Sequence, residues 1–515
     1  MAMATVLSRA QHGMDAPQVR VEVDISSGLP AFAIVGLPEA VVKESKDRVR
    51  AAIANCNFEI PAGRITVNLS PADLPKEGGR FDLPIAVGIL LASGQLPGAQ
   101  LDQCELYGEL SLSGEIQPVK GALLAALAAS KAGHRLIVPP PNAAEAQLVT
   151  RCPVATAKHL LEVAAHATKA NPLTFAFGAA PGPLASGGLD LADVHGQAQA
   201  RRALEIAAAG QHSLLFIGPP GTGKSMLAQR LPGLLPAMSE SEALEVAAIR
   251  SIIGATLAPK EWRIRPFRSP HHTASAIALV GGGAIPRPGE VTLAHNGVLF
   301  LDELPEYDRR VLEVLREPLE NGSITVSRAA QQLEFPARFQ LIAAMNPCPC
   351  GYLGDSAGRC RCTQEKIARY RAKISGPLLD RLDMHVEVPR VPVTALRASI
   401  QQNESTQIVA ARVLTARERQ LARQKKANAH LANRELELHC RTSRTAADVL
   451  ERATAMLGLS ARAHHRILRV ARTIADLAGE DEIGAVQISE AVALRRFDRA
   501  RAPSIALVPV ASEKR

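Results

Sequence analysis

The stretch LLFIGPPGTGKSML, residues 214–227, is the feature that most constrains how this chain can fold. An apolar run is followed by a glycine-rich loop that fits G-x-x-x-x-G-K-[ST], a pattern whose backbone N–H groups hold phosphates. We therefore predict a buried strand, a phosphate loop and a helix that begins at the lysine. In such loops the lysine, here Lys224, binds the β- and γ-phosphates, and the following hydroxyl, here Ser225, binds Mg²⁺. The predicted nucleotide-binding residues are Gly218, Pro219, Pro220, Gly221, Thr222, Gly223, Lys224 and Ser225.

Two further apolar runs end in polar residues of the kind that a phosphate loop requires. GVLFLDE ends in Asp302 and Glu303, and FQLIAAMN ends in Asn346. The carboxyl ends of parallel strands meet at one edge of a sheet, so we expect these side chains beside the loop. Asp302 is expected to hold the Mg²⁺ shell, and Glu303 to orient and polarise the attacking water. Asn346 is expected to lie between the other two strand ends and to sense the γ-phosphate. The expected cofactors are ATP and Mg²⁺.

The chain has 515 residues, which is too long for a single hydrophobic core. Composition and periodicity indicate an α/β protein with several units. The expected units are a mixed strand and helix domain at 1–165, a Gly-, Pro-, Ala- and Ser-rich linker at 166–190, a core of βα order at 191–390 and a helical domain at 391–515.

Several classes of protein are excluded or disfavoured by simple patterns. No run of eighteen apolar residues exists, so no membrane helix and no membrane partner are expected. The N-terminal stretch MAMATVLSRAQHGMDAP is too polar for a secretory signal. We therefore expect a cytoplasmic protein, in which the eight cysteines are reduced thiols or metal ligands.

The positive charge of the chain is concentrated near its end. The formal net charge is +9, and residues 391–515 alone hold 21 Lys and Arg against 13 Asp and Glu. The densest piece is ARVLTARERQLARQKK, residues 411–426. Two interpretations remain open for this piece: a solvated helix face, or a contact with a polyanion.

Long motifs in the central region resemble one family. FRSPHHTASAIALVGGG, PRPGEVTLAHNGVLFLDELPEYDRRVLEVLREPLENGSITVSRA and SGPLLDRLDMHVEV are similar to the magnesium-chelatase-like AAA+ ATPases, and more narrowly to the ComM (YifB) family. The similarity extends over essentially the whole chain. The resemblance implies an AAA+ αβα sandwich with a helical lid, a homohexameric ring that hydrolyses ATP at subunit interfaces, and a helicase that migrates branched DNA during natural transformation. The partners it implies are single-stranded and branched DNA, further copies of the chain and recombination proteins.

The resemblance also assigns arginines. Arg381, in SGPLLDRLDMHVEV, would complete the catalytic site of the neighbouring subunit. A second sensor arginine is expected on a lid helix within LSARAHHRILRVARTIADL, which offers Arg462, Arg466 and Arg469. We favour Arg462, because LSAR resembles the start of that helix.

The segment between Ser225 and Asp302 is long enough for an insertion in the basic βαβ unit. Within it, RSPHHTASAIALVGGG resembles the pore-lining insertion of this branch. Arg268, His271 and His272 could meet DNA phosphates there. The alternative is that the two histidines cap a helix or pack in a loop.

The N-terminal block resembles the Lon-protease proteolytic fold in NLSPADLPKEGGRFDLPIAVGIL and LSLSGEIQPVKGALLAALAASKAGHRLIVPP. That peptidase needs a serine activated by a lysine. Where the serine turn would fall, residues 78–81 read GGRF, and the lysine position falls on Leu123, with Lys120 three residues earlier. We predict no protease activity and a platform for ring assembly or DNA contact. Arg80 and Lys76 are either phosphate contacts or solvated charges.

Four cysteines lie within fifteen residues, as Cys348-Pro-Cys350 and Cys360-Arg-Cys362. Four thiolates held by tight turns are the donors of a tetrahedral Zn²⁺ site, although C-x-C spacing is less usual than C-x-x-C. Zinc and free reduced thiols both remain open. The other cysteines, expected in the core or at the surface, are Cys56, Cys104, Cys152 and Cys440.

Two classes of function therefore compete. The first is a hexameric DNA motor, favoured by the basic final quarter and the resemblance. The second is a remodelling or metal-insertion ATPase that acts on a protein partner, as magnesium chelatases do. A protease is disfavoured because the dyad is missing.

Overall fold

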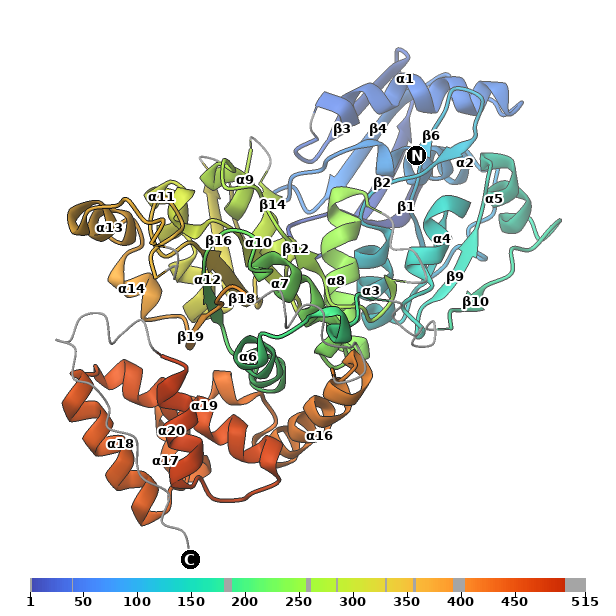
Figure 1. The fold of residues 1–515 in the computed structure, drawn as a ribbon. Coiled ribbons are helices and arrows are strands. Elements are labelled where there is room, and N and C mark those ends of the chain that lie inside the picture. Colours follow the sequence, from blue (N-terminus) through green and yellow to red (C-terminus); the bar gives the residue numbers. More distant parts are fainter. Residues whose placement is uncertain are drawn as a thin grey trace, which may run out of the picture.

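The computed structural model describes residues 2–38, 40–179, 188–255, 261–283, 286–328, 331–354, 358–391 and 403–495. Three parts follow one another along the chain: an N-terminal unit with a large mixed sheet, a core built on a parallel sheet, and a set of C-terminal helices (Figure 1). The chain is thus a mixed α/β protein with a helical C-terminal region, as predicted.

The N-terminal unit forms from strands whose residues alternate between buried and exposed, as in the QVRVEVDIS stretch. Its elements are β1 (Ala2–Arg9), β2 (Gln18–Ser26), β3 (Ala31–Val35), α1 (Ala40–Asn55), β4 (Arg64–Ser70), α2 (Asp82–Ala92), β5 (Cys104–Leu106), β6 (Glu109–Leu110), β7 (Ile116–Gln117), α3 (Ala122–Ala132), β8 (Arg135–Val138), α4 (Pro140–Ala146), β9 (Pro153–Thr156), α5 (Leu160–Ala167) and β10 (Ala176–Phe177). The main sheet has the order β10-β9-β8-β5-β1-β2-β4-β3 and is mixed, since β1 pairs antiparallel with β2 and parallel with β5.

The N-terminal unit extends further than the predicted boundary at 165. Strand β10 pairs antiparallel with β9 and so forms the edge of the sheet. Just before it, the ring of Phe175 packs against the guanidinium of Arg135, 4.8 Å from the ring centroid, and against His166. Residues 166–178 of the predicted linker therefore belong to this unit, while residues 180–187 lie outside the described residues. A two-residue edge strand has no periodicity from which to predict it.

The turn before α2 corrects the predicted roles of two basic residues. Lys76 is fully buried and donates a hydrogen bond to the carbonyl of Pro71. Arg80 is also buried and donates to the hydroxyl of Tyr107 at 2.6 Å. Neither residue is a solvated charge, and neither is accessible to a phosphate. Leu123, at the position where a lysine was sought, is fully buried in α3.

The core contains a parallel sheet of the order β12-β15-β18-β11-β19. Its elements are α6 (Ala198–Gly210), β11 (Leu214–Ile217), α7 (Lys224–Leu234), α8 (Glu240–Ile253), β12 (Phe267–Arg268), α9 (Ala276–Val280), β13 (Gly281–Gly282), β14 (Arg287–Pro288), α10 (Glu290–Leu293), β15 (Val298–Leu301), α11 (Arg309–Glu313), α12 (Arg316–Asn321), β16 (Ser323–Arg328), β17 (Gln331–Pro336), β18 (Gln340–Met345), α13 (Gln364–Arg371), α14 (Gly376–Leu379) and β19 (Met384–Glu387). Strands β11, β15 and β18 are the apolar runs of the sequence, and they are buried because helices cover both faces of the sheet.

The C-terminal helices share one hydrophobic core with α6, α7 and one face of the parallel sheet. They are α16 (Thr406–Gln424), α17 (Asn433–His439), α18 (Arg444–Leu457), α19 (Ala461–Ala478) and α20 (Ala485–Ala493). Figure 1 shows α6 between the sheet and these helices. Helices α10, α11 and α12 pack on the opposite face of the sheet.

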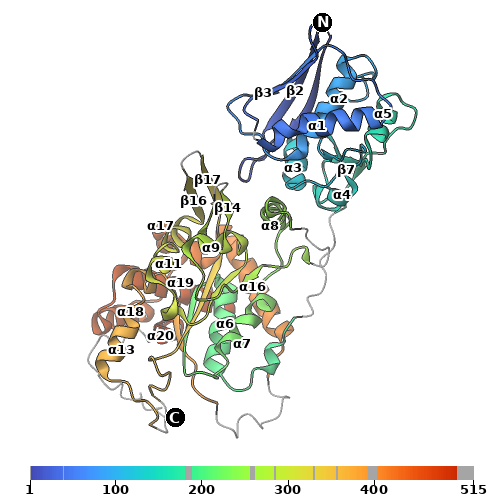
Figure 2. The same cartoon turned by 90° about the horizontal axis from the view of Figure 1, so that it is seen from above.

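Helix α8 joins the core to the N-terminal unit (Figure 2). Apolar residues of α8, among them Val246, share a buried cluster with α3 and with Trp262, the single tryptophan of the chain. Polar contacts extend this interface: the hydroxyl of Ser251 donates to Glu145 at 2.7 Å, and its carbonyl accepts from the N–H of Gly121.

The basic piece at 411–426 is largely engaged within the chain. Arg412 pairs with Glu404 and Glu205, and buried Arg417 donates to carbonyls at the end of α6. Arg423 pairs with Asp476. Because these arginines are paired within the chain, the piece is neither a simple solvated helix face nor an unpaired basic surface for a polyanion. Within the described ranges, no helix has the length and apolar character needed to cross a membrane.

Candidate nucleotide-binding site

The phosphate loop follows β11 and leads directly into α7, which begins at Lys224. Gly218 packs closely against the backbone of Val388, so that a Cβ at position 218 would lie 2.2 Å from the carbonyl oxygen of Val388. Gly221 and Gly223 have φ angles of +75° and +87°, which side-chain-bearing residues rarely adopt. The glycine spacing of the motif therefore reflects one close approach and two left-handed turns.

Lys224 lies at the centre of the loop. Its ammonium donates to the carbonyls of Gly218 and Pro219 at 2.8 and 2.9 Å, and to the side-chain oxygen of Asn346 at 3.2 Å. Burial lowers the pKa of Lys224, while Asp302 and Glu303 oppose this effect. Asn346 reaches the loop because β18, which it follows, is the direct neighbour of β11.

Ser225 and Asp302 are joined by a hydrogen bond of 2.5 Å from the serine hydroxyl to the carboxylate. Asp302 follows β15, on the other side of β18. A hydroxyl and a carboxylate so close together, next to an ammonium group, match the ligands with which phosphate loops hold Mg²⁺ and triphosphates. The residues present therefore fit Mg²⁺ and a nucleoside triphosphate.

Glu303 adopts an uncommon backbone conformation for a residue with a side chain, with φ 51°. Its side chain is about half exposed and forms an ion pair with His272, 3.2 Å from the ring nitrogen Nδ1. The loop that carries His272 is fixed by Tyr307, whose hydroxyl donates to the carbonyl of Pro270 at 2.6 Å. Burial raises the pKa of Tyr307, and the carboxylates of Asp302 and Glu303 raise it further. The sequence did not indicate this pairing of Glu303 with a histidine.

The other basic residues of the predicted insertion also have partners within the chain. Arg268 forms a bidentate ion pair with Glu290, with distances of 2.6 and 2.7 Å. His271 contacts Thr273 and lies against His272 with the two rings tilted and their centroids 4.2 Å apart. The two histidines therefore pack within a loop, and a contact of this loop with DNA phosphates stays a prediction.

Arg381 is not directed at the phosphate loop of its own chain. Its guanidinium donates to the carbonyl of Pro377 at 2.7 Å and pairs with Glu320 on α12. The side chain is 8% exposed. Its role at a neighbouring site remains a prediction, and in that role the guanidinium would have to leave Glu320.

The lid arginines lie on α19. Arg462 is exposed in its first turn, Arg466 pairs with Asp383 before β19, and Arg469 donates to the carbonyl of Leu431 at 2.9 Å. Among the described residues, these three arginines form no hydrogen bond or ion pair with the phosphate loop. Their place as second sensor stays a prediction.

Gln197 was not singled out from the sequence, yet it contacts the site. It precedes α6 with a φ of +54°, and its side-chain amide donates to the carbonyls of Thr222 and Pro389. It thus ties α6 to the phosphate loop and to the segment after β19. The left-handed backbone conformation of Gln197 before α6 is its distinguishing feature, and this conformation has no distinct signal in the sequence.

The four clustered cysteines converge near this site. The Sγ atoms of Cys348, Cys350, Cys360 and Cys362 all lie within 4.8 Å of one another. The four remaining cysteines are buried, and none of the eight forms a disulfide.

Three family models together match most of the chain. The model described as "Magnesium chelatase, subunit ChlI" matches residues 190–396, which include the phosphate loop and both polar strand ends. "Subunit ChlI of Mg-chelatase" matches residues 21–142, and "Magnesium chelatase, subunit ChlI C-terminal" matches residues 403–495.

Two bacterial relatives are similar to this chain over almost their full length. The competence protein ComM of Haemophilus influenzae is 50% identical over 97% of this chain and 98% of its own. The YifB protein of Salmonella typhimurium is 51% identical over the same shares. The magnesium-chelatase subunit ChlI of Anabaena variabilis is 29% identical over 25% of this chain and 31% of its own. The phosphate loop with its two polar strand ends, the three matching models and these identities together show that the chain belongs to the ComM/YifB family of magnesium-chelatase-like AAA+ proteins.

Proposed function

We propose that this protein is an ATP hydrolase that works as a DNA helicase and branch-migration motor in natural transformation and recombination. The observation that carries the ATPase part is the convergence of Lys224, Ser225, Asp302 and Asn346 at one edge of the parallel sheet. The competence protein among its relatives supports the link to transformation.

In the proposed reaction each residue acts on the triphosphate in a defined way. Lys224 exchanges the loop carbonyls for phosphate oxygens, which are stronger acceptors. Ser225 and Asp302 hold Mg²⁺, which neutralises charge on the phosphates when bound. Asn346 orients the γ-phosphate, and Glu303 accepts the proton of the attacking water once its side chain leaves His272.

The proposed working form is a homohexameric ring with its catalytic sites between subunits. Arg381 points away from the phosphate loop of its own chain, which is the arrangement expected of an arginine that serves a neighbour. A closed ring also places equivalent surfaces of all copies around one central path.

DNA is the proposed substrate of the motor, in single-stranded and branched forms. The formal charge of +9 favours a polyanionic partner. The N-terminal unit, which we propose to be a Lon-like domain without a catalytic dyad, would serve as a platform for ring assembly. Recombination proteins are the proposed further partners.

The competing proposal is a remodelling or metal-insertion ATPase that acts on a protein. Its support is the match to the chelatase subunit, but that relative covers a quarter of this chain at 29% identity. ComM and YifB match nearly all of the chain at 50% and 51% identity, so the DNA motor is the better supported proposal.

One experiment separates the two proposals. ATP hydrolysis is measured with the full chain alone, with single-stranded DNA and with forked DNA, at low and raised salt. We expect DNA to stimulate turnover, and binding to fall steeply as salt rises because bound phosphates release counterions. Failure to bind any DNA form at low salt would contradict the DNA motor. If ATP hydrolysis were retained in that case, the remodelling ATPase would be the better supported proposal. Imaging with an ATP analogue and forked DNA reports the subunit count and the strand path.

A further inference from the structure

The four clustered cysteines come from two segments that flank one turn-rich loop. Cys348 and Cys350 follow β18 and Asn346, and Cys360 and Cys362 precede α13. We call residues 347–354 and 358–363 together the cysteine knuckle. Cys348 is fully buried and the other three are half-buried.

The sulfur positions fit a single tetrahedral metal ion. Three Sγ–Sγ distances are short: 3.4 Å between Cys348 and Cys350, 3.8 Å between Cys348 and Cys360, and 3.7 Å between Cys350 and Cys360. A tetrahedron with metal–sulfur bonds of about 2.3 Å has edges of about 3.8 Å. A disulfide would need about 2.05 Å. The cluster is therefore shaped for one ion shared by four sulfurs.

The knuckle packs directly on the phosphate loop. The N–H of Gly351 donates to the carbonyl of Cys348 at 2.9 Å and closes a tight turn. A Cβ added to Gly351 would stand 2.6 Å from Cδ of Pro220, in the phosphate loop, and 3.8 Å from Cγ of Asn346. The turn that carries Cys350 thus touches both the phosphate loop and the residue that binds Lys224.

Further contacts hold the knuckle to the rest of the site. The guanidinium of Arg371, on α13, donates to the carbonyl of Pro347. The ring of Tyr352 contacts the guanidinium groups of Arg359 and Arg390, 4.6 and 5.5 Å from its centroid. Arg390 follows Pro389, whose carbonyl accepts from Gln197. Gln197 also donates to the carbonyl of Thr222, so this chain of contacts connects the knuckle to the phosphate loop a second time.

We propose that Cys348, Cys350, Cys360 and Cys362 bind one Zn²⁺ as thiolates, and that the zinc-bound knuckle holds the phosphate loop and Asn346 in the geometry that binds nucleotide. Four thiols lose their protons to solvent when the ion binds, and no oxidation is involved. Removing the ion frees the turn at Gly351, so the phosphate loop loses its support on that side. This inference rests on the nucleotide site proposed above.

The first test measures metal content and nucleotide affinity on the purified full chain. Elemental analysis is expected to give about one zinc per chain. A zinc chelator, or the double variant Cys360→Ser/Cys362→Ser, is expected to weaken binding of a fluorescent ATP analogue by about tenfold or more. Zinc added back restores the affinity of the chelated protein but not that of the variant. Cys440→Ala, which removes a buried cysteine of the lid, is the control and leaves zinc and affinity unchanged.

A matched pair of glycine variants tests the contact itself. Gly351 and Gly354 have nearly equal φ angles, +81° and +80°. A Cβ added at Gly351 would clash with Pro220, whereas a Cβ added at Gly354 would have no atom within 4 Å. Gly351→Ala is expected to weaken nucleotide binding while zinc is retained. Gly354→Ala carries the same backbone strain and is expected to bind nucleotide as the parent does.

The outcomes separate this inference from the proposed function. Iron in place of zinc, metal-free protein after zinc-replete expression, unchanged affinity after zinc removal, or equal effects of the two glycine variants would overturn the inference. If the parent binds the analogue and Lys224→Ala does not, the nucleotide site stands even when the inference falls. If the parent itself binds no nucleotide, the proposed function and this inference both fall.

Discussion

At the scale of single residues, the candidate site contains two adjacent carboxylates in different settings. Asp302 is tied to Ser225 by a 2.5 Å hydrogen bond, whereas Glu303 is about half exposed and paired with a histidine. The first setting suits a metal ligand, whose oxygens must stay in place. The second suits a group that changes partner during a reaction, because an exposed ion pair with one histidine is weak and easily broken.

The roles of Lys224 and Glu303 lead to a first prediction. Lys224→Ala should abolish ATP hydrolysis, because it removes the ammonium that meets the phosphates. Glu303→Gln should retain bound ATP but lower kcat at least about 100-fold, since an amide cannot accept the proton of water. Steady-state turnover and nucleotide binding are the measurements. Glu306→Gln, a nearby exposed acid paired with Lys373, is the control and should keep the parental rate. Full turnover in Glu303→Gln would show that another group activates the water.

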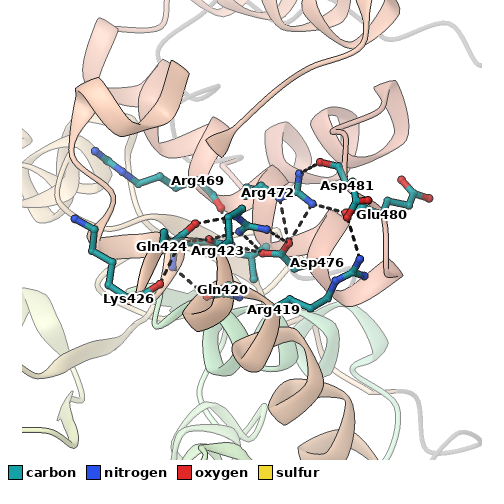
Figure 3. A network of polar contacts seen from close by, with 12 residues as sticks. Arg419, Gln420, Arg423, Gln424, Lys426, Arg469, Arg472, Asp476, Glu480 and Asp481 are labelled. Atoms are coloured by element: carbon teal, nitrogen blue, oxygen red, sulfur yellow. Dashed lines mark hydrogen bonds and ion pairs between the residues drawn. The ribbon is translucent and has the colours of Figure 1, made fainter. Parts of the chain in front are cut away.

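At the scale of elements, the lid helices are held together by a buried polar network as well as by apolar packing (Figure 3). Asp476 of α19 is fully buried and accepts both bonds of a bidentate pair from Arg423 of α16, at 2.7 and 2.9 Å. Arg472, one turn earlier on α19, also pairs with Asp476 and donates to the carbonyls of Glu480 and Asp481. The network thus fixes α16, α19 and the turn after α19 to one another.

A second prediction concerns this network. Asp476→Ala leaves two arginines without their carboxylate, one of them fully buried, and is expected to destabilise the lid by about 3 kcal/mol. Thermal unfolding followed by circular dichroism measures the effect. Asp481→Ala is the matched control. The side chain of Asp481 pairs with Arg419 but is 99% exposed, so this ion pair should contribute less than about 1 kcal/mol to the free energy of unfolding. Equal losses in the two variants would mean that the buried network does not stabilise the lid.

At the scale of the whole molecule, two clusters of buried apolar residues each contain members from more than one of the three parts. The lid meets the core through the apolar cluster around α6 and through Arg466 with Asp383. The N-terminal unit meets the core through α8. Both interfaces connect to elements next to the phosphate loop, because α7 begins at that loop and leads into α8. Rearrangement at the loop is therefore expected to reach both flanking parts.

The pairing of lid and core predicts a dependence on pH. Burial opposes ionisation of Asp383, but Arg466 and His212 hold its pKa well below the ordinary range. A carboxyl with a lowered native pKa contributes stability above its unfolded pKa of about 3.9, and this contribution is lost as the pH falls below that value. Asp383→Asn should therefore lower the unfolding temperature at pH 7, and its difference from the parent should shrink below pH about 4.

Thermal unfolding at several pH values between 7 and 3.5 checks this prediction. Asp448→Asn, on an exposed face of α18, is the control and should match the parent throughout. An unfolding difference for Asp383→Asn that stays constant down to the lowest pH would contradict an electrostatic origin.

The proposed sharing of catalytic sites between subunits gives a fourth prediction. Lys224→Ala and Arg381→Ala should each be inactive alone. In an equal mixture, about a quarter of the interfaces combine an intact phosphate loop with an intact arginine, so up to about a quarter of the parental ATPase rate should return. Turnover after mixing and re-equilibration is the measurement.

The control for this mixture is Glu320→Ala, because Glu320 is the partner of Arg381 within one chain. If Arg381 serves only that ion pair, Glu320→Ala should lose as much activity as Arg381→Ala. If Arg381 serves a neighbour, Glu320→Ala should keep most of its turnover. No recovery in the mixture would contradict shared sites.

Local features of this protein could be predicted from its amino-acid sequence. The phosphate loop, the polar ends of the strands that lead to Asp302 and Asn346, and the helical final quarter follow from short motifs and periodicity. The convergence of those strand ends was predictable as well, because parallel strands of a phosphate-loop fold end at one edge.

Most contacts between distant residues could be known only from the folded chain. The place of Asn346 between Asp302 and the loop was predicted, but the full order β12-β15-β18-β11-β19 differs from the chain order and was not. Several features could not be recognised in the sequence. They are the pairing of Glu303 with His272, the burial of Lys76 and Arg80, the edge strand β10 and the contact of Gly351 with Pro220. The physical reason is that burial and partner choice depend on how whole elements pack, and no window of neighbouring residues contains that information.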